Sequence, residues 1–148
     1  MIRKAKLRDL ETIIDYNQAL ARETEGVGLD RETLFKGVLS LLSDEAKGCY
    51  FLYEEGGKVV GQLLVTYEWS DWRNANFWWI QSVYVHPDYR RRGIFRKLFE
   101  FLKAEAEKED TVCGLRLYVE ERNLPAQATY RKLAMNPSKY LMYEWEKT

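Results

Sequence analysis

Cysteine and histidine are both scarce in this chain, which argues against several classes of protein. The 148 residues contain two cysteines, Cys49 and Cys113, and one histidine, His86. Two cysteines so far apart make neither a disulfide framework nor a CxxC motif, and one histidine offers too few ligands for a typical zinc site. We therefore expect a reduced, cytoplasmic protein that holds no metal.

Long apolar runs and an excess of one charge are also absent. No apolar run approaches the roughly 20 residues that a membrane-spanning helix needs, and the basic start of the chain is not followed by the apolar region of a signal peptide. Lys plus Arg and Asp plus Glu number 23 each, so the formal net charge is zero. No overall field attracts the chain to nucleic acid or to an anionic membrane, and we expect neither as a partner.

Aromatic residues, in contrast, are plentiful. They make up 14% of the chain, with five Trp and ten Tyr, within an ordinary globular balance of 46% hydrophobic and 31% charged residues. Such a chain can build a stiff core and a pocket lined with rings. The length suits one domain, residues 1–148, because no internal repeat, linker or low-complexity tract divides it.

The spacing of apolar residues predicts alternating strands and helices. Strands are expected at residues 2–5, 50–53, 59–67, 76–85, 115–119 and 139–146, and helices at residues 10–25, after an Asp30 cap, at 95–107 and after Asn123. The strands from residues 76 and 115 should be parallel neighbours joined by a right-handed crossover through the helix between them. The order β-α-α-β-β-β-α-β-α-β predicts an α/β (α+β) fold, with a mixed, mostly antiparallel central sheet and helices on both faces.

The most informative stretch is the connection after the strand that ends at Val85. Three arginines and Gly93 follow this strand and directly precede an amphipathic helix. The first N–H groups of a helix and its partial positive charge suit a diphosphate, which Gly93 would allow to approach closely. A solvated turn is the alternative, but a position at the carboxyl end of a buried strand favours a ligand site.

This stretch resembles the signature of the GNAT superfamily of N-acetyltransferases, which reads Arg or Gln, two residues, Gly, one residue, then Gly or Ala. Arg90, Gly93 and the preceding strand residues 83–85 match it, whereas Phe95 stands where the family has Gly or Ala. A second match resembles the family's pattern of Asn, Ala, Tyr and a closing Gly-Phe. It consists of Asn123, Ala126, Tyr130 and Leu133-Ala134-Met135, with Ala134 in place of Gly.

The resemblance covers nearly the whole chain and implies an enzyme that uses acetyl-CoA. It implies transfer of the acetyl group to a primary amine by direct attack in a ternary complex. It also implies that the pantetheine arm lies along the backbone of one strand, that the diphosphate lies in the arginine loop, and that an asparagine contacts the cofactor. The implied cofactor-binding residues are Val83, Tyr84, Val85, Arg90, Arg91, Arg92, Gly93, Ile94, Phe95, Asn123 and Tyr130.

Two residues are candidates for catalysis. Tyr130 is the candidate general acid for the departing thiolate, although a helical tyrosine can also be a core residue. Gln81 stands where many relatives carry Glu, and its amide cannot accept a proton at neutral pH. The base is therefore left open among Glu68, Asp71, Tyr84, an ordered water chain and an amine that arrives neutral.

The segment that joins the strands expected at residues 59–67 and 76–85, together with the start of the second strand, is the candidate acceptor site. It is placed like a Trp-containing segment of diamine acetyltransferases. Glu68, Asp71 and Trp79, with Glu25 as a further candidate, would suit a small cationic amine, and packing of the Trp residues against helices or a partner is the alternative.

Three functions are consistent with the sequence. The first is a small-molecule N-acetyltransferase, the second a peptide or protein N-acetyltransferase, and the third an acyl-CoA-binding sensor or interaction domain with little turnover. A homodimer is expected at the level of the family only.

Overall fold

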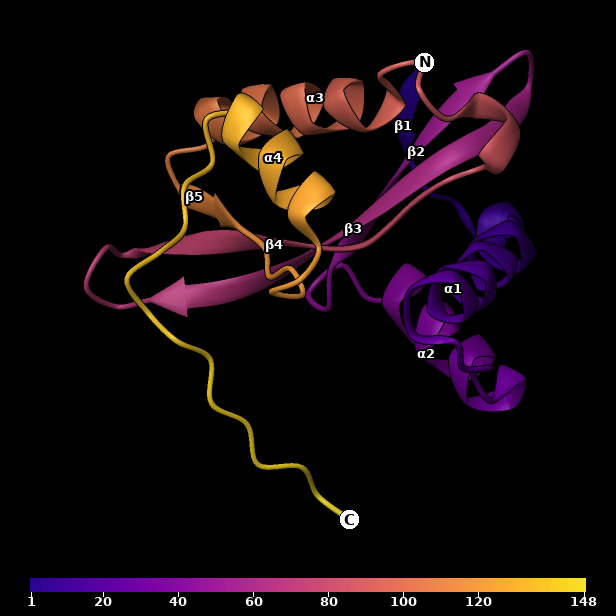
Figure 1. Ribbon diagram of the computed structural model, residues 1–148, viewed down its shortest axis with the longest axis horizontal. Helices are drawn as coiled ribbons and strands as arrows, with labels where there is room; N and C mark the ends of the chain where they lie inside the picture. Colours follow the sequence, from indigo (N-terminus) through magenta and orange to yellow (C-terminus); the bar gives the residue numbers. More distant parts are fainter. The chain divides into compact units, whose positions relative to one another are not determined.

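The computed structural model describes all 148 residues and divides into two compact units, residues 1–117 and residues 118–148. The first unit holds a five-stranded sheet with the order β1-β2-β3-β4-β5. No helix is both long and apolar enough to span a bilayer. The elements of the first unit, shown in Figure 1, are β1 (Ile2–Lys4), α1 (Leu10–Glu25), α2 (Arg31–Leu42), β2 (Cys49–Glu55), β3 (Lys58–Ser70), β4 (Ala75–Val85), α3 (Ile94–Lys108) and β5 (Val112–Arg116).

The sheet is mixed and mostly antiparallel, as predicted. Strands β1 to β4 pair antiparallel in chain order, and β4 pairs parallel with β5. Helix α3 is the crossover between these two parallel strands, and it lies on the face of the sheet opposite α1 and α2 (Figure 1). Helices therefore cover both faces, which confirms the predicted fold class.

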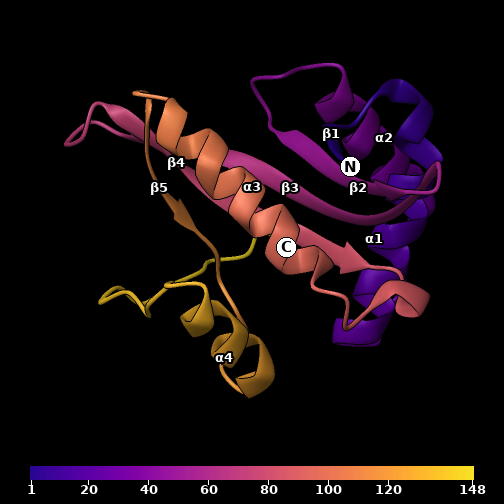
Figure 2. The ribbon, with the colours of Figure 1, turned by 90° about the horizontal axis from the view of Figure 1, so that it is seen from above.

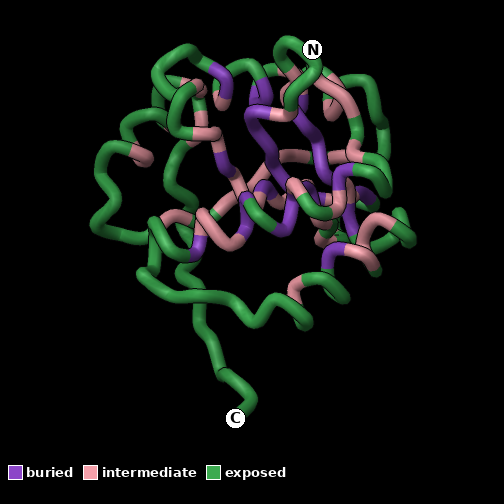
Figure 3. The backbone as a smooth tube through the Cα atoms, turned by 90° about the vertical axis from the view of Figure 1, so that its right-hand side faces the viewer, coloured by how far each residue is buried: buried purple, intermediate pink, exposed green.

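Alternation along β2 divides the core between the two faces. Tyr50 and Leu52 belong to a buried cluster with Ile13 of α1 and Val38 of α2. The residue between them, Phe51, points to the other face, where its ring centroid lies 5.6 Å from that of Phe101 in α3. Buried positions concentrate in the strands and in the helix faces turned toward them (Figure 3).

Short-range signals fixed several boundaries correctly. The Asp30 carboxylate accepts a hydrogen bond from the Thr33 amide at 3.0 Å and caps α2 as expected. Gly56 and Gly57 form the turn between β2 and β3 with φ of 59° and 77°, a left-handed conformation that glycine adopts without strain.

The predicted strand at residues 115–119 is wrong in its position. Strand β5 begins at Val112, three residues earlier, and ends at Arg116. Its parallel register with β4 runs from the Asn76–Val112 pair to the Trp79–Arg116 pair. Alternation predicted the type of element, but its bounds depend on where β4 offers backbone partners, and that is not visible in the local sequence.

The predicted last strand, residues 139–146, is absent. These residues form no strand, and large side chains among them are exposed, with 84% of Leu141 and 87% of Trp145 accessible to solvent. Alternating apolar residues indicate that a segment can pair, whereas a strand exists only where a neighbouring strand takes up its hydrogen bonds.

The second unit contains one helix, α4 (Leu124–Lys132), which begins as predicted. The Asn123 side-chain oxygen accepts a hydrogen bond from the Ala126 amide at 3.2 Å and caps the helix. Pro125 occupies its first turn, where an N–H would have no partner in the helix. After the helix, Ala134 has φ of 63°, so it adopts the left-handed conformation usual for a glycine at this place.

Candidate active site

One edge of β4 is left without a strand partner at its carboxyl end. Strand β4 pairs with β5 only as far as Trp79, and residues 80–85 have no partner on that side. Strand β5 lies at the edge of the sheet beside β4 (Figure 2) and ends at Arg116, the partner of Trp79. Since no strand pairs with this edge of residues 80–85, an extended ligand can bind there as an added strand would be bound. Two of the backbone oxygens already accept a side-chain hydrogen bond, that of Ser82 from Gln62 and that of Val85 from Arg90.

A bulge interrupts β4 on its other side. The register with β3 shifts between Gln62 and Leu64, and Ser82 has φ of 49°. A left-handed conformation is costly for a residue with a side chain, and such outliers gather at functional sites. The bulge re-aims the residues of β4 at the start of the unpaired segment.

The connection from β4 to α3 ends in a tight cradle, formed by residues 90–95. Arg91 and Gly93 both lie in the left-handed region, with φ of 64° and 72°. The Lys97 amide donates to the Gly93 oxygen at 3.0 Å, and this is the first hydrogen bond of α3. In any helix, the amides that precede the first such donor have no partner within the helix. No atom lies within 4 Å of the place where a Gly93 side chain would begin. This open helix N-terminus fits a diphosphate group.

The three arginines of the loop make different contacts. The Arg90 Nε donates to the Val85 oxygen at 2.8 Å, and its guanidinium pairs with Glu23 of α1 at 2.8 Å. Arg92 lies 3.6 Å from a Glu55 carboxylate oxygen. Arg91 enters no ion pair of the structure and can pair with an anion without losing one.

The side chains around the cradle are held by packing. Burial of Ile94 brings its methyl group to 2.9 Å from the position where a Cβ at Gly61 would lie, so that close approach requires glycine. The Phe95 ring lies 6.4 Å from Phe99 and joins the inner stripe of α3, so its backbone can still face a ligand.

Tyr84 is buried, and its ring centroid lies 4.9 Å from that of Tyr16. Burial is the main cause that raises the pKa of Tyr84, and the charge of Glu23 raises it further. A tyrosine with a raised pKa stays protonated at neutral pH and cannot serve as the base.

The predicted acceptor residues come together only in part. The Trp79 Nε1 donates to Glu68 at 2.7 Å, and Arg116 pairs with the same carboxylate at 3.1 Å. Glu68 is therefore neutralised by a cation within the sheet. Asp71 lies in the exposed turn between β3 and β4 and does not join this group. Gln81 donates a hydrogen bond to the Thr66 hydroxyl.

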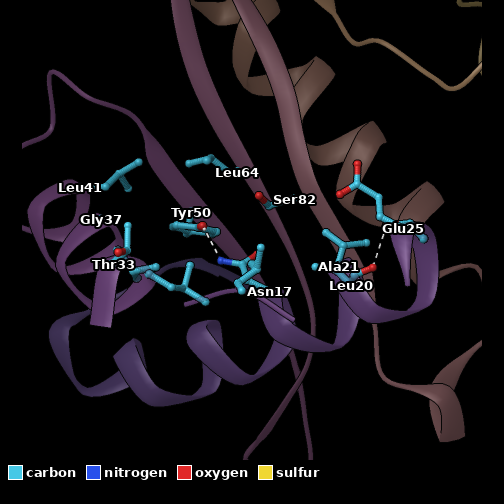
Figure 4. Close-up of a pocket in the computed structure, with 14 residues that line it drawn as sticks. Asn17, Leu20, Ala21, Glu25, Thr33, Gly37, Leu41, Tyr50, Leu64 and Ser82 are labelled. Carbon is cyan, nitrogen blue, oxygen red and sulfur yellow. Dashed lines mark hydrogen bonds between the residues drawn. The ribbon is translucent and has the colours of Figure 1, made fainter. Parts of the chain in front are cut away.

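A cleft of about 540 Å³ lies where α1 and α2 pack over the sheet (Figure 4). Of the residues proposed from sequence, it includes only Glu25. Its lining consists of Asn17, Leu20, Ala21, Thr24, Glu25, Leu29, Thr33, Leu34, Gly37, Val38, Leu41, Tyr50, Leu64 and Ser82.

Buried polar residues support this cleft. The Asn17 amide donates to the Tyr50 hydroxyl at 3.0 Å (Figure 4), and Gln62 donates to the Asn17 oxygen at 3.1 Å. Burial raises the pKa of Tyr50, while its hydrogen bonds with Asn17 and Ser82 act in the opposite direction. Sequence reasoning missed these residues, although a signal was present. Asn17 interrupts the apolar face of α1, and Gln62 interrupts the apolar run of β3.

Asn123 and Tyr130 belong to the second unit. The Asn123 oxygen is used as the helix cap described above, and its amide N–H groups are a separate donor. Burial raises the pKa of Tyr130, so this phenol is protonated at neutral pH.

Comparison with known proteins agrees with this geometry. The model of the Acetyltransferase (GNAT) family matches residues 10–135. A possible acetyltransferase from Clostridium difficile 630 is 53% identical, with a TM-score of 0.96 over 100% of this chain and 97% of that one. A predicted acetyltransferase from Clostridium acetobutylicum, solved with acetyl-CoA, shares the fold at 16% identity, with a TM-score of 0.77 over 97% of this chain and 95% of that one.

A curated relative matches over a shorter stretch. Thialysine N-epsilon-acetyltransferase from Bos taurus is 33% identical over 79 residues, which are 53% of this chain and 45% of that enzyme. The match thus spans less than half of the length of that relative. Since the family model covers most of the chain and the fold agrees throughout, the chain belongs to the acetyltransferase (GNAT) family.

Proposed function

We propose that this protein transfers the acetyl group of acetyl-CoA to a primary amine of a small molecule that binds in the cleft between α1, α2 and the sheet. One observation carries the proposal. Ser82 lines the cleft and also belongs to the segment of β4 that has no partner toward β5. The acceptor cleft and the free strand edge therefore meet at the same residue.

Acetyl-CoA supplies an acetyl group activated as a thioester. The backbone of Val83 and Val85 would hold its extended arm, and the loop from Arg90 to Phe95 would hold its diphosphate. Peptide N–H groups on the free edge of β4 would also donate to the carbonyl oxygen, where negative charge develops during acyl transfer.

Tyr130 is the proposed proton donor for the departing sulfur. Its raised pKa keeps the phenol protonated at neutral pH, which a general acid requires. Its pKa lies above the value of about 8.5 for a thiol, so the proton transfer needs support from the site.

Removal of the amine proton is assigned to solvent. Gln81 is an amide, Glu68 is paired with Arg116, and a buried Tyr84 keeps its proton. The amine would then react from its neutral form, and kcat/KM would rise with pH as that form becomes more abundant.

The names of the relatives support this proposal. The bovine relative is named for acetylation of an amine, and the Clostridium difficile relative is described as a possible acetyltransferase. The proposed enzyme differs from an acyl-CoA sensor in one measurable respect, because a sensor would bind acetyl-CoA without consuming it.

Release of free thiol from acetyl-CoA on addition of a panel of amines and peptides tests the function. We expect small primary amines to give turnover well above the hydrolysis measured without an amine. Turnover with peptides alone would move the assignment to a peptide acetyltransferase. Tight binding of acetyl-CoA with no turnover would contradict the enzymatic proposal.

A further inference from the structure

The lining of the cleft limits the kind of amine that it can accept. Half of the lining residues are aliphatic, and they come from both helices, from the connection between these helices and from β3. They are Leu20, Ala21, Leu29, Leu34, Val38, Leu41 and Leu64. Such walls stabilise a ligand by removing its apolar surface from water, and they offer few partners to a ligand with many polar groups.

The lining of the cleft contains a single charged residue. Glu25 is its only carboxylate, and no Lys, Arg or His takes part. Glu25 is also the last residue of α1, where the helix dipole places partial negative charge. A cationic amine is attracted to this cleft, whereas an anionic group would lose its water without gaining a positive partner.

The polar groups near β4 are neutral and fixed in orientation. Gln62 donates to the Asn17 oxygen, so the Asn17 amide nitrogen is turned toward Tyr50. Ser82 lies beside Tyr50 in the same lining (Figure 4). These hydroxyls can accept hydrogen bonds from an amine nitrogen at the end of the cleft that meets the free edge of β4.

We propose that the acceptor is a primary amine carried on an apolar alkyl or aralkyl body without an anionic group, and that Gly37 sets the room for that body. This inference rests on the proposed function. Gly37 lines the cleft from α2, and no atom lies within 4 Å of the place where its Cβ would be. A Cβ atom at this position would meet open space, so a larger side chain would extend into the cleft.

Two matched pairs of amines test the selectivity for uncharged bodies. Hexylamine is compared with 6-aminohexanoate, and 2-phenylethylamine with phenylalanine, so that each pair differs by one carboxylate. We expect kcat/KM to be about tenfold or more higher for the member without the carboxylate. Equal rates within the pairs, or a preference for the carboxylates, would overturn the inference and leave the proposed acetyl transfer intact.

Gly37→Leu tests the location, with Gly28→Leu as the matched control. Gly28 also has no atom near the place of its Cβ, and it does not line the cleft. We expect Gly37→Leu to lower kcat/KM for hexylamine about tenfold or more, with unchanged thermal stabilisation by acetyl-CoA, and Gly28→Leu to match the parent. Equal kcat/KM in Gly37→Leu and in the parent would overturn the assignment of the cleft.

A binding measurement separates this inference from the proposed function. In the presence of CoA, we expect hexylamine to raise the melting temperature of the parent protein but not that of Gly37→Leu. This result is expected whether or not turnover occurs. If hexylamine binds in preference to 6-aminohexanoate but no thiol is released, the enzymatic function is rejected while the inferred class of ligand is retained. Stabilisation by 6-aminohexanoate equal to that by hexylamine would reject the ligand class.

Discussion

Two left-handed residues shape the cradle at the start of α3. Gly93 adopts this conformation freely, whereas Arg91 adopts it with a side chain that makes it costly. The conformation leaves open space at Gly93, and the first amides of α3 follow directly. At the scale of single residues, backbone shape rather than side-chain chemistry therefore builds the proposed diphosphate site.

Gly93→Ala should separate the shape of this cradle from general stability. Alanine in the left-handed region costs about 1–2 kcal/mol, and its methyl group would occupy the open space. We expect a lower melting temperature and a marked loss of the thermal shift caused by acetyl-CoA. Gly57→Ala is the control, because Gly57 has φ of 77° and equally open surroundings in a distant turn. An equal loss of the acetyl-CoA shift in both variants would contradict the assignment.

Tyr130→Phe removes the proposed proton donor and little else from the side chain. We expect kcat to fall by about 100-fold or more, the range usual for loss of a general acid, while the affinity for acetyl-CoA stays within a few-fold of the parent. Single-turnover thiol release and calorimetric titration give the two quantities. A variant as fast as the parent would show that Tyr130 is a packing residue.

At the scale of elements, one ion pair connects helix α1 to the loop between β4 and α3. Glu23 of α1 forms an ion pair with Arg90, and the Nε of Arg90 also donates a hydrogen bond to the Val85 carbonyl oxygen. Both Arg90 and Val85 are proposed to contact acetyl-CoA, so binding of the cofactor competes with these contacts. The same helix lines the proposed acceptor cleft, at Thr24 and Glu25 among other residues.

Glu23→Gln should therefore tighten binding of acetyl-CoA. A half-exposed ion pair is worth about 0.2–1 kcal/mol, which corresponds to an increase in affinity of up to about fivefold. Calorimetric titration measures the effect, and Glu32→Gln, which removes an exposed pair with Lys36 on α2, is the control. Weaker binding in Glu23→Gln alone would mean that the ion pair supports the cofactor site instead of competing with it.

The elements also show how far the sequence alone could lead. Helix caps, turns and amphipathic stripes are local signals, so Asp30, Gly57 and the inner face of α3 were interpreted correctly. The position of β5 and the absence of a strand at residues 139–146 depend on partners elsewhere in the sheet, which no local pattern records. The resemblance directed attention to the loop after β4, but it did not reveal the cleft.

The cleft was missed because its residues come from several separate elements. Asn17, Gly37, Tyr50 and Ser82 lie on α1, α2, β2 and β4, and none belongs to a motif. Of the acceptor residues predicted near one continuous segment, Glu68 pairs with Arg116 and accepts a hydrogen bond from Trp79, whereas Asp71 lies apart from them in an exposed turn.

At the scale of the whole molecule, a partly buried ion pair links strand β1 to Asp9, the residue that precedes α1. Arg3 donates to both oxygens of Asp9 at 2.8 and 2.9 Å, and Asp9 is nearly buried. The hydrogen bond from Arg3 is the main cause that lowers the pKa of Asp9 below its usual value. Because the pKa is lower in the folded state, this carboxylate stabilises the fold above its unfolded pKa of about 3.9. The contribution is lost as pH falls through the lowered pKa.

Asp9→Asn should lower the free energy of unfolding at pH 7 by about 1–3 kcal/mol, since it removes one of the two carboxylates that pair with Arg3 and leaves only Glu54. Urea denaturation measures this free energy. The difference from the parent should shrink as pH falls from the unfolded pKa of about 3.9 through the lowered pKa of Asp9 in the folded protein. Glu32→Gln, at an exposed site, should change stability little at any pH. A difference that stays constant down to pH 2 would contradict the role given to the Asp9 charge.

Binding of acetyl-CoA at the start of α3 is the claim on which the functional account depends. The most direct test follows the backbone amide resonances of the protein by nuclear magnetic resonance during titration with acetyl-CoA. We predict large, saturable shifts for the amides of residues 91–96, as expected when N–H groups donate to phosphate oxygens. Saturable binding that leaves these amides unchanged, or no binding at all, would contradict the account.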